Sequence, residues 1–131
     1  MQTAAFTSSA AILLVRDVVA AAHHYRDRLG FTFDRFWGEP PNFVILFRDQ
    51  CRLMLHLAPP GHAILPHWRV SPQMWNVYFW VDDADALYAE YLRRGAKIDY
   101  EIRDKPYGIR EFGIQDLDGY DIAFGSPIRA R

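Results

Sequence analysis

The five histidines are the side chains of this sequence best suited to acid–base or metal chemistry near neutral pH. His23 and His24 fall on the polar side of a predicted helix, where a solvated face is expected. His62 and His67 lie on a proline-rich stretch without a third and fourth ligand. His56 is the exception, because it lies on a predicted strand. No nucleophile, base and orienting group form a set, so no catalytic residue is predicted.

The residues best suited to binding lie in the strand-like run 76–81, which is rich in aromatic side chains. If the odd-numbered apolar residues of this run face a helix, then Asn76, Tyr78 and Trp80 face the other way, because side chains alternate along a strand. They would line an apolar and aromatic cleft that suits a flat heteroaromatic or amphipathic ligand. The alternative is that these rings fill a core or a dimer interface.

Two residues of another strand, Met54 and His56, are expected on the cleft side, since they alternate with three leucines in the run 52–57. His56 is a candidate for orienting a ligand, and a histidine satisfied by a hydrogen bond in the core is the alternative. Aromatic residues around the Pro40–Pro41 loop are expected to form a rim that closes over a ligand: Phe36, Trp37 and Phe43.

Arg110 is the cationic candidate for the same cleft. We expect it either to contact an anionic group of the ligand or to form a structural ion pair. Its possible ion-pair partners are acidic residues close in sequence: Glu111, Asp116 and Asp121. A β-bulge near residues 116–119 would reverse the faces that residues 110–115 present.

These candidates must be positioned by the C-terminal run 107–124 and the elements before it. Two strand-like stretches flank Asp116-Leu117-Asp118-Gly119, and Asp-Gly between such stretches is a strong hairpin signal because glycine adopts positive φ without steric cost. Upstream, an aromatic strand is followed by a helix over residues 83–95 and a strand over 97–102. The second half is therefore predicted to be strand, helix, strand, strand, strand.

The same order of elements is predicted in the first half, from a strand over residues 10–16 to a hairpin that ends at residue 57. Gly30 and Gly95 each end a predicted helix. At an offset of 66 residues, Asp17 corresponds to Asp83 and starts its helix in the same way. By this offset, three residues of the first strand are expected on the opposite wall of the cleft: Ala10, Ile12 and Leu14.

The repeat and the length predict one α+β domain that spans residues 1–131. Its first module covers about residues 8–58 and its second module about residues 73–126. The linker, residues 59–72, holds four of the eight prolines and is expected to cover one rim of the site.

Composition and charge exclude several classes of partner. The net charge is −1 and no Lys/Arg tract occurs, so nucleic acid is not expected. The apolar run 10–15 is too short for a membrane span or signal peptide, and no membrane partner is expected. One cysteine, Cys51, cannot form an intrachain disulfide, which suits a reducing cytoplasm.

The order of elements and several local motifs resemble the glyoxalase, bleomycin-resistance and extradiol dioxygenase superfamily, also called the vicinal oxygen chelate fold. The motifs are Leu29-Gly30-Phe31, Gly108-x-Arg110-Glu111-Phe112 and Asp116-x-Asp118-Gly119. The likeness is strongest to bleomycin-resistance proteins, whose aromatic-x-aromatic pair at this strand position is matched by Tyr78 and Trp80. The resemblance implies tandem βαβββ modules in curved, eight-stranded half-barrels and homodimers with clefts at the interface.

The resemblance also implies where a metal would bind in the metal-dependent members. The corresponding positions here are Ala10, Met54 or His56, Asn76 and Ala123. Alanine cannot coordinate a metal, and a divalent site needs three or more N, O or S donors. We therefore predict no metal and no other cofactor.

The leading functional prediction is a metal-independent protein that sequesters an aromatic or amphipathic small molecule, such as a bleomycin-like antibiotic. One alternative is a lyase, isomerase or dioxygenase of the same fold, either metal-dependent or with His56 as a general base. Another is a dimerising module whose cleft has no dedicated ligand. Against bleomycin itself stands the nearly neutral net charge of −1, because a cationic drug suits an acidic cleft better.

Overall fold

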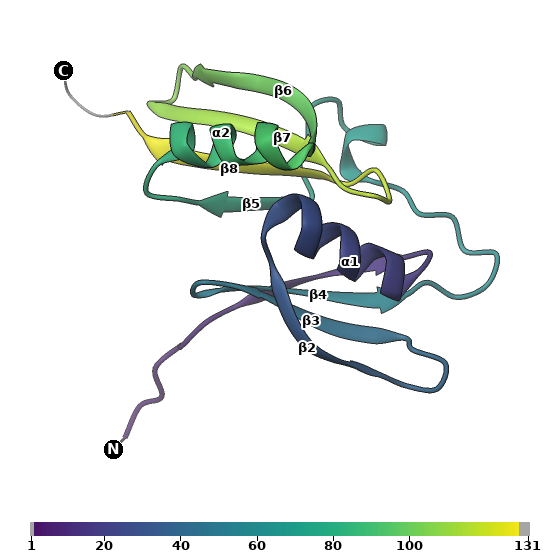
Figure 1. Cartoon of the computed structure of the whole chain (residues 1–131). Helices are drawn as coiled ribbons and strands as arrows, with labels where there is room; N and C mark the ends of the chain where they lie inside the picture. Colours follow the sequence, from purple (N-terminus) through teal and green to yellow (C-terminus); the bar gives the residue numbers. More distant parts are fainter. Residues whose placement is uncertain (1, 129–131) are drawn as a thin grey trace.

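Two βαβββ modules follow each other in the computed structural model, which describes residues 2–128 (Figure 1). The first module comprises β1 (Ala10–Val15), α1 (Val18–Leu29), β2 (Thr32–Trp37), β3 (Phe43–Arg48) and β4 (Cys51–Leu57). The second comprises β5 (Val77–Trp80), α2 (Ala84–Arg94), β6 (Lys97–Asp104), β7 (Ile109–Gln115) and β8 (Asp121–Pro127). The α+β fold with tandem modules is thus confirmed.

Each module forms its own four-stranded sheet, in the order β1-β4-β3-β2 and β5-β8-β7-β6. The first and last strands of each module are parallel neighbours, and the remaining pairs are antiparallel. The linker between β4 and β5 contains the short 3-10 helix η1 (His67–Arg69). No helix in residues 2–128 is long and apolar enough to cross a membrane.

The two helices begin and end with the same devices, 66 residues apart. Asp17 and Asp83 are the N-caps, and each carboxylate accepts a 3.0 Å hydrogen bond from the backbone N–H three residues later. Gly30 and Gly95 end the helices in the left-handed region, both with φ of 74°. The internal repeat predicted from the sequence is therefore present in the local structure of both modules.

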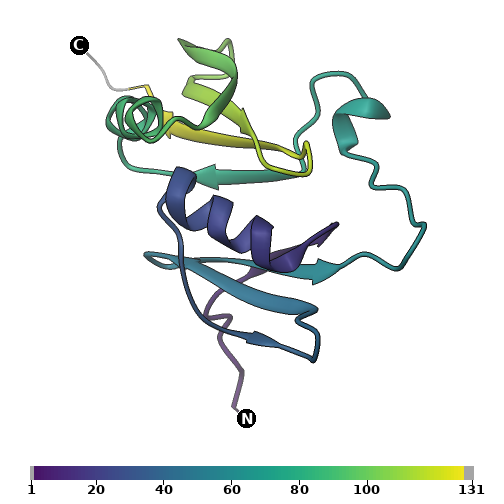
Figure 2. The same cartoon turned by 45° about the vertical axis from the view of Figure 1, so that its right-hand side comes forward.

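The helix-covered faces of the two sheets are turned toward each other, and α1 lies between the sheets (Figures 1 and 2). Apolar side chains from both sheets and both helices consequently share one core. The sheet residues in this core are Leu13, Val15, Val44, Leu46, Leu53, Leu55, Val77, Phe112, Ile114, Ile122 and Phe124. The prediction that the leucines of β4 alternate with outward-facing Met54 and His56 is confirmed for Leu53 and Leu55, which are fully buried.

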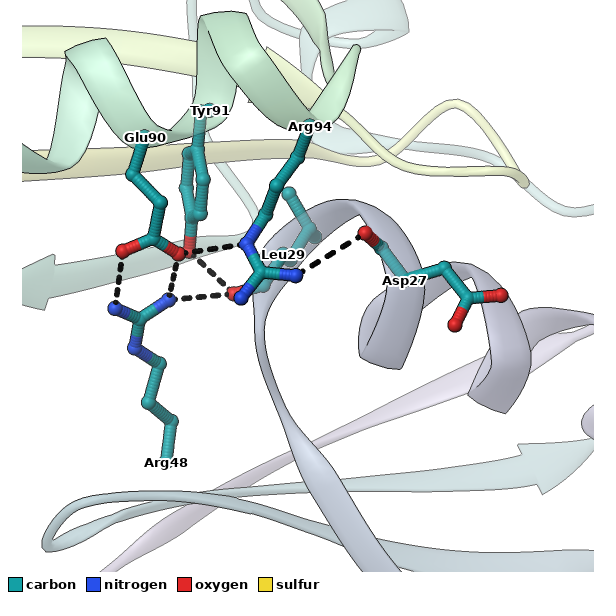
Figure 3. A network of polar contacts seen from close by, with 6 residues as sticks. All are labelled: Asp27, Leu29, Arg48, Glu90, Tyr91 and Arg94. Carbon is teal, nitrogen blue, oxygen red and sulfur yellow. Dashed lines mark hydrogen bonds and ion pairs between the residues drawn. The ribbon is translucent and has the colours of Figure 1, made fainter.

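A network of polar contacts joins the modules along one edge of this core (Figure 3). Arg48 of β3 makes two hydrogen bonds of 2.8 Å to the carboxylate of Glu90 on α2. Arg94 donates to the same carboxylate at 2.8 Å, and Tyr91 donates to the backbone oxygen of Leu29 at 2.8 Å. The Arg48 guanidinium lowers the pKa of Glu90 to about 2, so this carboxylate is ionised at neutral pH.

The opposite face of each sheet, which we call its open face, carries no helix. Because the covered faces meet in the shared core, the two open faces point away from it on opposite sides. The expectation that Ala10, Ile12 and Leu14 line a wall opposite Tyr78 is therefore wrong within one chain. Ile12 lies on the open face of the first sheet, and its side chain is 64% exposed.

Candidate functional site

The centre of the open face of the second sheet, which we call its floor, consists of three small residues and one glutamate. In the two central strands, Gly113 of β7 pairs with Ala123 of β8, and Glu111 pairs with Gly125. Residues paired across strands point to the same side of a sheet, so all four lie on the open face. The flanking strands add large aromatic side chains to this floor, because Tyr78 of β5 pairs with Ala123.

Glycine is required at two points of the floor because tyrosines cross it. A Cβ atom at Gly113 would overlap the ring of Tyr100, and one at Gly125 would overlap the hydroxyl of Tyr78. Neither glycine has the positive φ that demands glycine for backbone reasons. Their role is therefore to let the tyrosine side chains lie flat on the sheet.

The two tyrosines and a third one converge on Glu111, whose side chain is fully buried. Tyr78 and Tyr100 each donate a 2.7 Å hydrogen bond to its carboxylate, and Tyr107 donates one of 2.6 Å. The indole N–H of Trp75 donates to the Tyr100 hydroxyl at 2.9 Å. The buried carboxylate is thus satisfied by three phenols, which in turn hold the aromatic rings in fixed positions.

The phenols in this cluster remain protonated over the physiological pH range. Burial, followed by the hydrogen bond to Glu111, raises the pKa of Tyr107 to about 12. The same two causes raise the pKa of Tyr78 and Tyr100 further above the usual value. The cluster therefore acts as a preorganised set of donors and rings.

A cavity of about 450 Å³ opens above this cluster, a volume in the range of small-molecule pockets. It is bounded by aromatic and charged side chains of β6, β7, β8 and the end of the linker. The lining residues are Gln73, Trp75, Asp99, Tyr100, Arg103, Lys105, Tyr107, Glu111 and Asp121. The surface therefore offers flat rings for stacking together with charged groups for recognition.

The three residues predicted on β5 and just before it have different surroundings. Tyr78 belongs to the Glu111 cluster, and Trp80 lies next to it, with the two ring centroids 5.0 Å apart. Trp80 is 63% exposed. The Asn76 side chain accepts a 2.9 Å hydrogen bond from the backbone N–H of His67. Asn76 therefore anchors the linker at the edge of this face.

The residues predicted on the first module lie on the other open face. Trp37, Phe43 and His56 form a row across β2, β3 and β4, with the Phe43 and His56 rings 6.2 Å apart. His56 Nδ1 lies 2.8 Å from the backbone oxygen of Leu57, and because a carbonyl oxygen only accepts hydrogen bonds, Nδ1 carries a proton. Met54 lies beside this row, paired with Ile12 and Ile45.

Two predicted residues lie on helix-covered sides. The Phe36 ring packs against Phe33 and His23, with centroids 5.1 and 6.4 Å away, because a bulge in β2 turns it toward α1. Arg110 points away from Glu111, since neighbouring strand residues face opposite sides. Its guanidinium instead pairs with Asp85 at 3.0 Å and with a second carboxylate of β6, Asp104, at 3.1 Å. The expected ion pairs of Arg110 with Glu111, Asp116 or Asp121 are not the ones formed.

Four residues of the Glu111 cluster were not among the sequence candidates: Trp75, Tyr100, Tyr107 and Glu111. A signal for Glu111 was present, because alternation from the apolar Phe112 and Ile114 places Glu111 and Gly113 on the opposite face. Glycines inside two adjacent strands also indicate close approach by other side chains. No local signal pointed to Tyr100, whose position depends on a bulge in β6.

The side chains present do not fit the metal of the metal-dependent relatives. Among residues 2–128, no three or more His, Cys, Asp or Glu side chains come together as a metal site would require. Two corresponding strand positions are Ala10 and Ala123, which offer no donor. Asn76 is engaged by the linker.

The two tandem modules and the pocket on an open sheet face can be compared with known proteins. A family model described as Glyoxalase/Bleomycin resistance protein/Dioxygenase superfamily matches residues 7–124, and the chain belongs to this superfamily. The family expected from the sequence motifs is thereby confirmed. No curated protein matches the sequence.

Solved structures show the same fold at low sequence identity. The bleomycin-binding protein of Streptomyces verticillus, solved with copper(II)-bleomycin, is 24% identical over 98% of this chain and 100% of that one, with a TM-score of 0.68. TnmS3, an antibiotic-binding protein from Streptomyces sp. CB03234, is 21% identical over 96% and 99%, with a TM-score of 0.71. A glyoxalase-related enzyme from Clostridium phytofermentans is 15% identical over 98% and 100%, with a TM-score of 0.74.

Proposed function

We propose that this protein is a metal-independent small-molecule-binding protein of the bleomycin-resistance type. It sequesters an aromatic or amphipathic molecule, such as a bleomycin-like antibiotic, in the cytoplasm. The ligand lies against the Glu111 cluster of the second sheet, in a cleft completed by the open face of the first sheet from a second copy of the chain. Binding requires no reaction, only a preorganised surface with slow ligand release.

The observation that carries the proposal is the contrast between the two open faces. The open face of the second sheet holds fixed tyrosines around a buried carboxylate and a pocket. That of the first sheet is largely apolar, and Ile12 at the middle of an edge strand is 64% exposed. An apolar sheet face of this kind calls for a cover. Within one chain the second sheet cannot supply it, because the covered faces are packed together.

Two of the structural neighbours support this type of function. Both the Streptomyces verticillus protein and TnmS3 are described as binding proteins for antibiotics. The glyoxalase-related neighbour keeps an enzyme as the second candidate. Within the described residues, the metal-ligand positions expected for such an enzyme include two alanines, which favours the binding protein.

The dimer is tested by measuring the mass in solution by light scattering for the wild type, Ile12→Glu and Leu92→Glu. Both replaced side chains are exposed and apolar, but Leu92 lies on α2, away from the open faces. We expect a dimeric wild type, a monomeric Ile12→Glu variant and a dimeric Leu92→Glu variant. A monomeric wild type at high protein concentration contradicts the two-chain cleft.

Ligand binding is tested by titration with copper(II)-bleomycin and a library of flat antibiotics. Tryptophan fluorescence and the thermal unfolding temperature are the two signals measured. A specific ligand at 100 times its Kd stabilises the fold by about 2.7 kcal/mol. Trp80→Ala should weaken binding, whereas Leu92→Glu should leave it unchanged. Stoichiometric Fe, Mn, Ni or Zn in the purified protein, with turnover lost on chelation, would instead establish the enzyme.

A further inference from the structure

A bulge in β6 directs two consecutive side chains onto the open face of the second sheet. Ile98 pairs with Ile114, and Tyr100 pairs with Gly113, so β6 contains one residue more than β7 between these pairs. The extra residue is Asp99. Such bulges re-aim side chains, and here both Asp99 and Tyr100 line the cavity above the Glu111 cluster.

Asp99 meets a second carboxyl group, that of Asp121 at the start of β8. The Asp121 side chain is only 4% exposed, and its Oδ1 atom has no hydrogen-bond donor. Burial, followed by the hydrogen bond and the charge repulsion with Asp99, raises the pKa of Asp121. Because two like charges repel each other, a cation bound beside both carboxylates would be favoured.

The surroundings of the pair favour a flat cation. Trp75 and Tyr100 border the same cavity, and aromatic faces attract cations. Lys105 already lies 5.4 Å from the centroid of the Tyr100 ring. Of the basic lining residues, Arg103 lies near the end of β6, where it is the strand partner of Glu111, and Lys105 follows directly after β6. In the strand register, neither basic residue is a partner of Asp99 or Asp121.

We propose that Asp99 and Asp121 form a subsite for a cationic nitrogen group of the ligand, such as an amine, amidine or guanidinium, whose flat part lies against Trp75 and Tyr100. The cation lies beside Asp121 Oδ1, the buried carboxylate oxygen that has no hydrogen-bond donor. This subsite rests on the proposed function and specifies the chemistry of its ligand: a planar molecule that carries a hydrogen-bond-donating positive charge.

The test uses two flat probes of nearly the same shape, benzamidine, which is positively charged at neutral pH, and benzamide, which is neutral. Their dissociation constants are measured by NMR titration, with the indole N–H signal of Trp75 as the reporter. A charged group gains more from a carboxylate than a neutral one does, so we expect benzamidine to bind at least about tenfold more tightly than benzamide.

Matched variants assign this preference to the pair. Asp99→Asn and Asp121→Asn keep the shape of the side chain and should bring benzamidine binding down to the level of benzamide. Glu101→Gln, on the same strand but outside the cavity lining, should preserve the preference. Because Asp99 is exposed, its variant is expected to fold even if replacement of the buried Asp121 impairs folding.

Three results would overturn the subsite: equal binding of both probes to the wild type, an unchanged preference in both asparagine variants, or no binding of either probe near Trp75. In any of these cases the proposed function still stands if antibiotic-like ligands stabilise the wild type against thermal unfolding and stabilise Trp80→Ala less. Both proposals fail only if those ligands do not bind either.

Discussion

Tyr25 of the first module donates a 2.6 Å hydrogen bond to Asp116, which lies 91 residues later on the loop between β7 and β8. Both side chains are buried at the junction of the modules. The same carboxylate accepts hydrogen bonds from the backbone N–H groups of Asp118 and Tyr120. A single residue therefore shapes the hairpin turn and ties it to α1.

Because of this contact, the loss of stability caused by Tyr25→Phe should depend on pH. Burial raises the pKa of Asp116 to about 6 in the folded state, while the Tyr25 hydrogen bond favours the ionised form. Because the folded pKa is raised, the contribution of Asp116 to the free energy of unfolding is fully present below its unfolded pKa, and it is lost as pH rises through about 6. Removing the Tyr25 hydroxyl should cost about 1 to 3 kcal/mol, and more above the folded pKa than below it.

The measurement is chemical denaturation of the wild type and Tyr25→Phe at about pH 7.5 and about pH 4.5, on either side of the folded pKa. A loss of stability that is equal at both pH values would show that ionisation of Asp116 is not linked to this hydrogen bond.

The Arg48–Glu90 ion pair is predicted to contribute to stability across the module junction. Glu90→Gln removes the charge that accepts two hydrogen bonds from Arg48 and one from Arg94, so we expect a loss of about 1 to 3 kcal/mol at neutral pH. The folded pKa of Glu90 is lowered to about 2, so its contribution is present above the unfolded value and lost as pH falls toward 2.

Asp27→Asn is the matched control for this prediction. Its pair with Arg26 is exposed, and its removal should change stability very little. Urea denaturation of the three proteins measures both effects. Equal stability of Glu90→Gln and the wild type would contradict a structural role for the inter-module pair.

Gly113→Ala is predicted to disturb the open face of the second sheet through a steric clash. The added Cβ overlaps the Tyr100 ring, so we expect a loss of about 1 to 3 kcal/mol and weaker ligand binding. A double-mutant cycle with Tyr100→Ala tests the cause, because the alanine should be tolerated once the ring is gone. Additive effects of the two substitutions would exclude the clash as the reason.

Glu111→Gln is predicted to alter the titration of the tyrosines. Burial raises the pKa of Tyr107 most, and the hydrogen bond to the Glu111 carboxylate adds to this, giving a value of about 12; loss of the Glu111 charge should therefore lower the pKa of Tyr107 part of the way toward its usual value of 10.0. Alkaline titration followed by tyrosinate absorbance measures the change, with Asp85→Asn on the covered side as the control. An unchanged titration curve would mean that the tyrosines do not depend on the carboxylate.

Much of the local structure could be predicted from the sequence because its causes are local. Asp17 and Asp83 cap helices through hydrogen bonds that span three residues, and Gly30 and Gly95 end them through a backbone conformation that only glycine adopts readily. Strand alternation likewise separates buried Leu53 and Leu55 from Met54 between them. The repeated order of such signals was sufficient for the family and the fold.

Only the tertiary structure decided which faces meet and which polar groups come together. The periodicity of a strand indicates that one face is buried, but not whether a helix, another module or another chain buries it. Arg110 and Glu111 are adjacent in sequence, yet the pleat sends one toward Asp85 and the other toward three tyrosines from separate elements. These partners lie on strands and loops whose positions depend on bulges and on the shared core, which are long-range packing effects without a local sequence code.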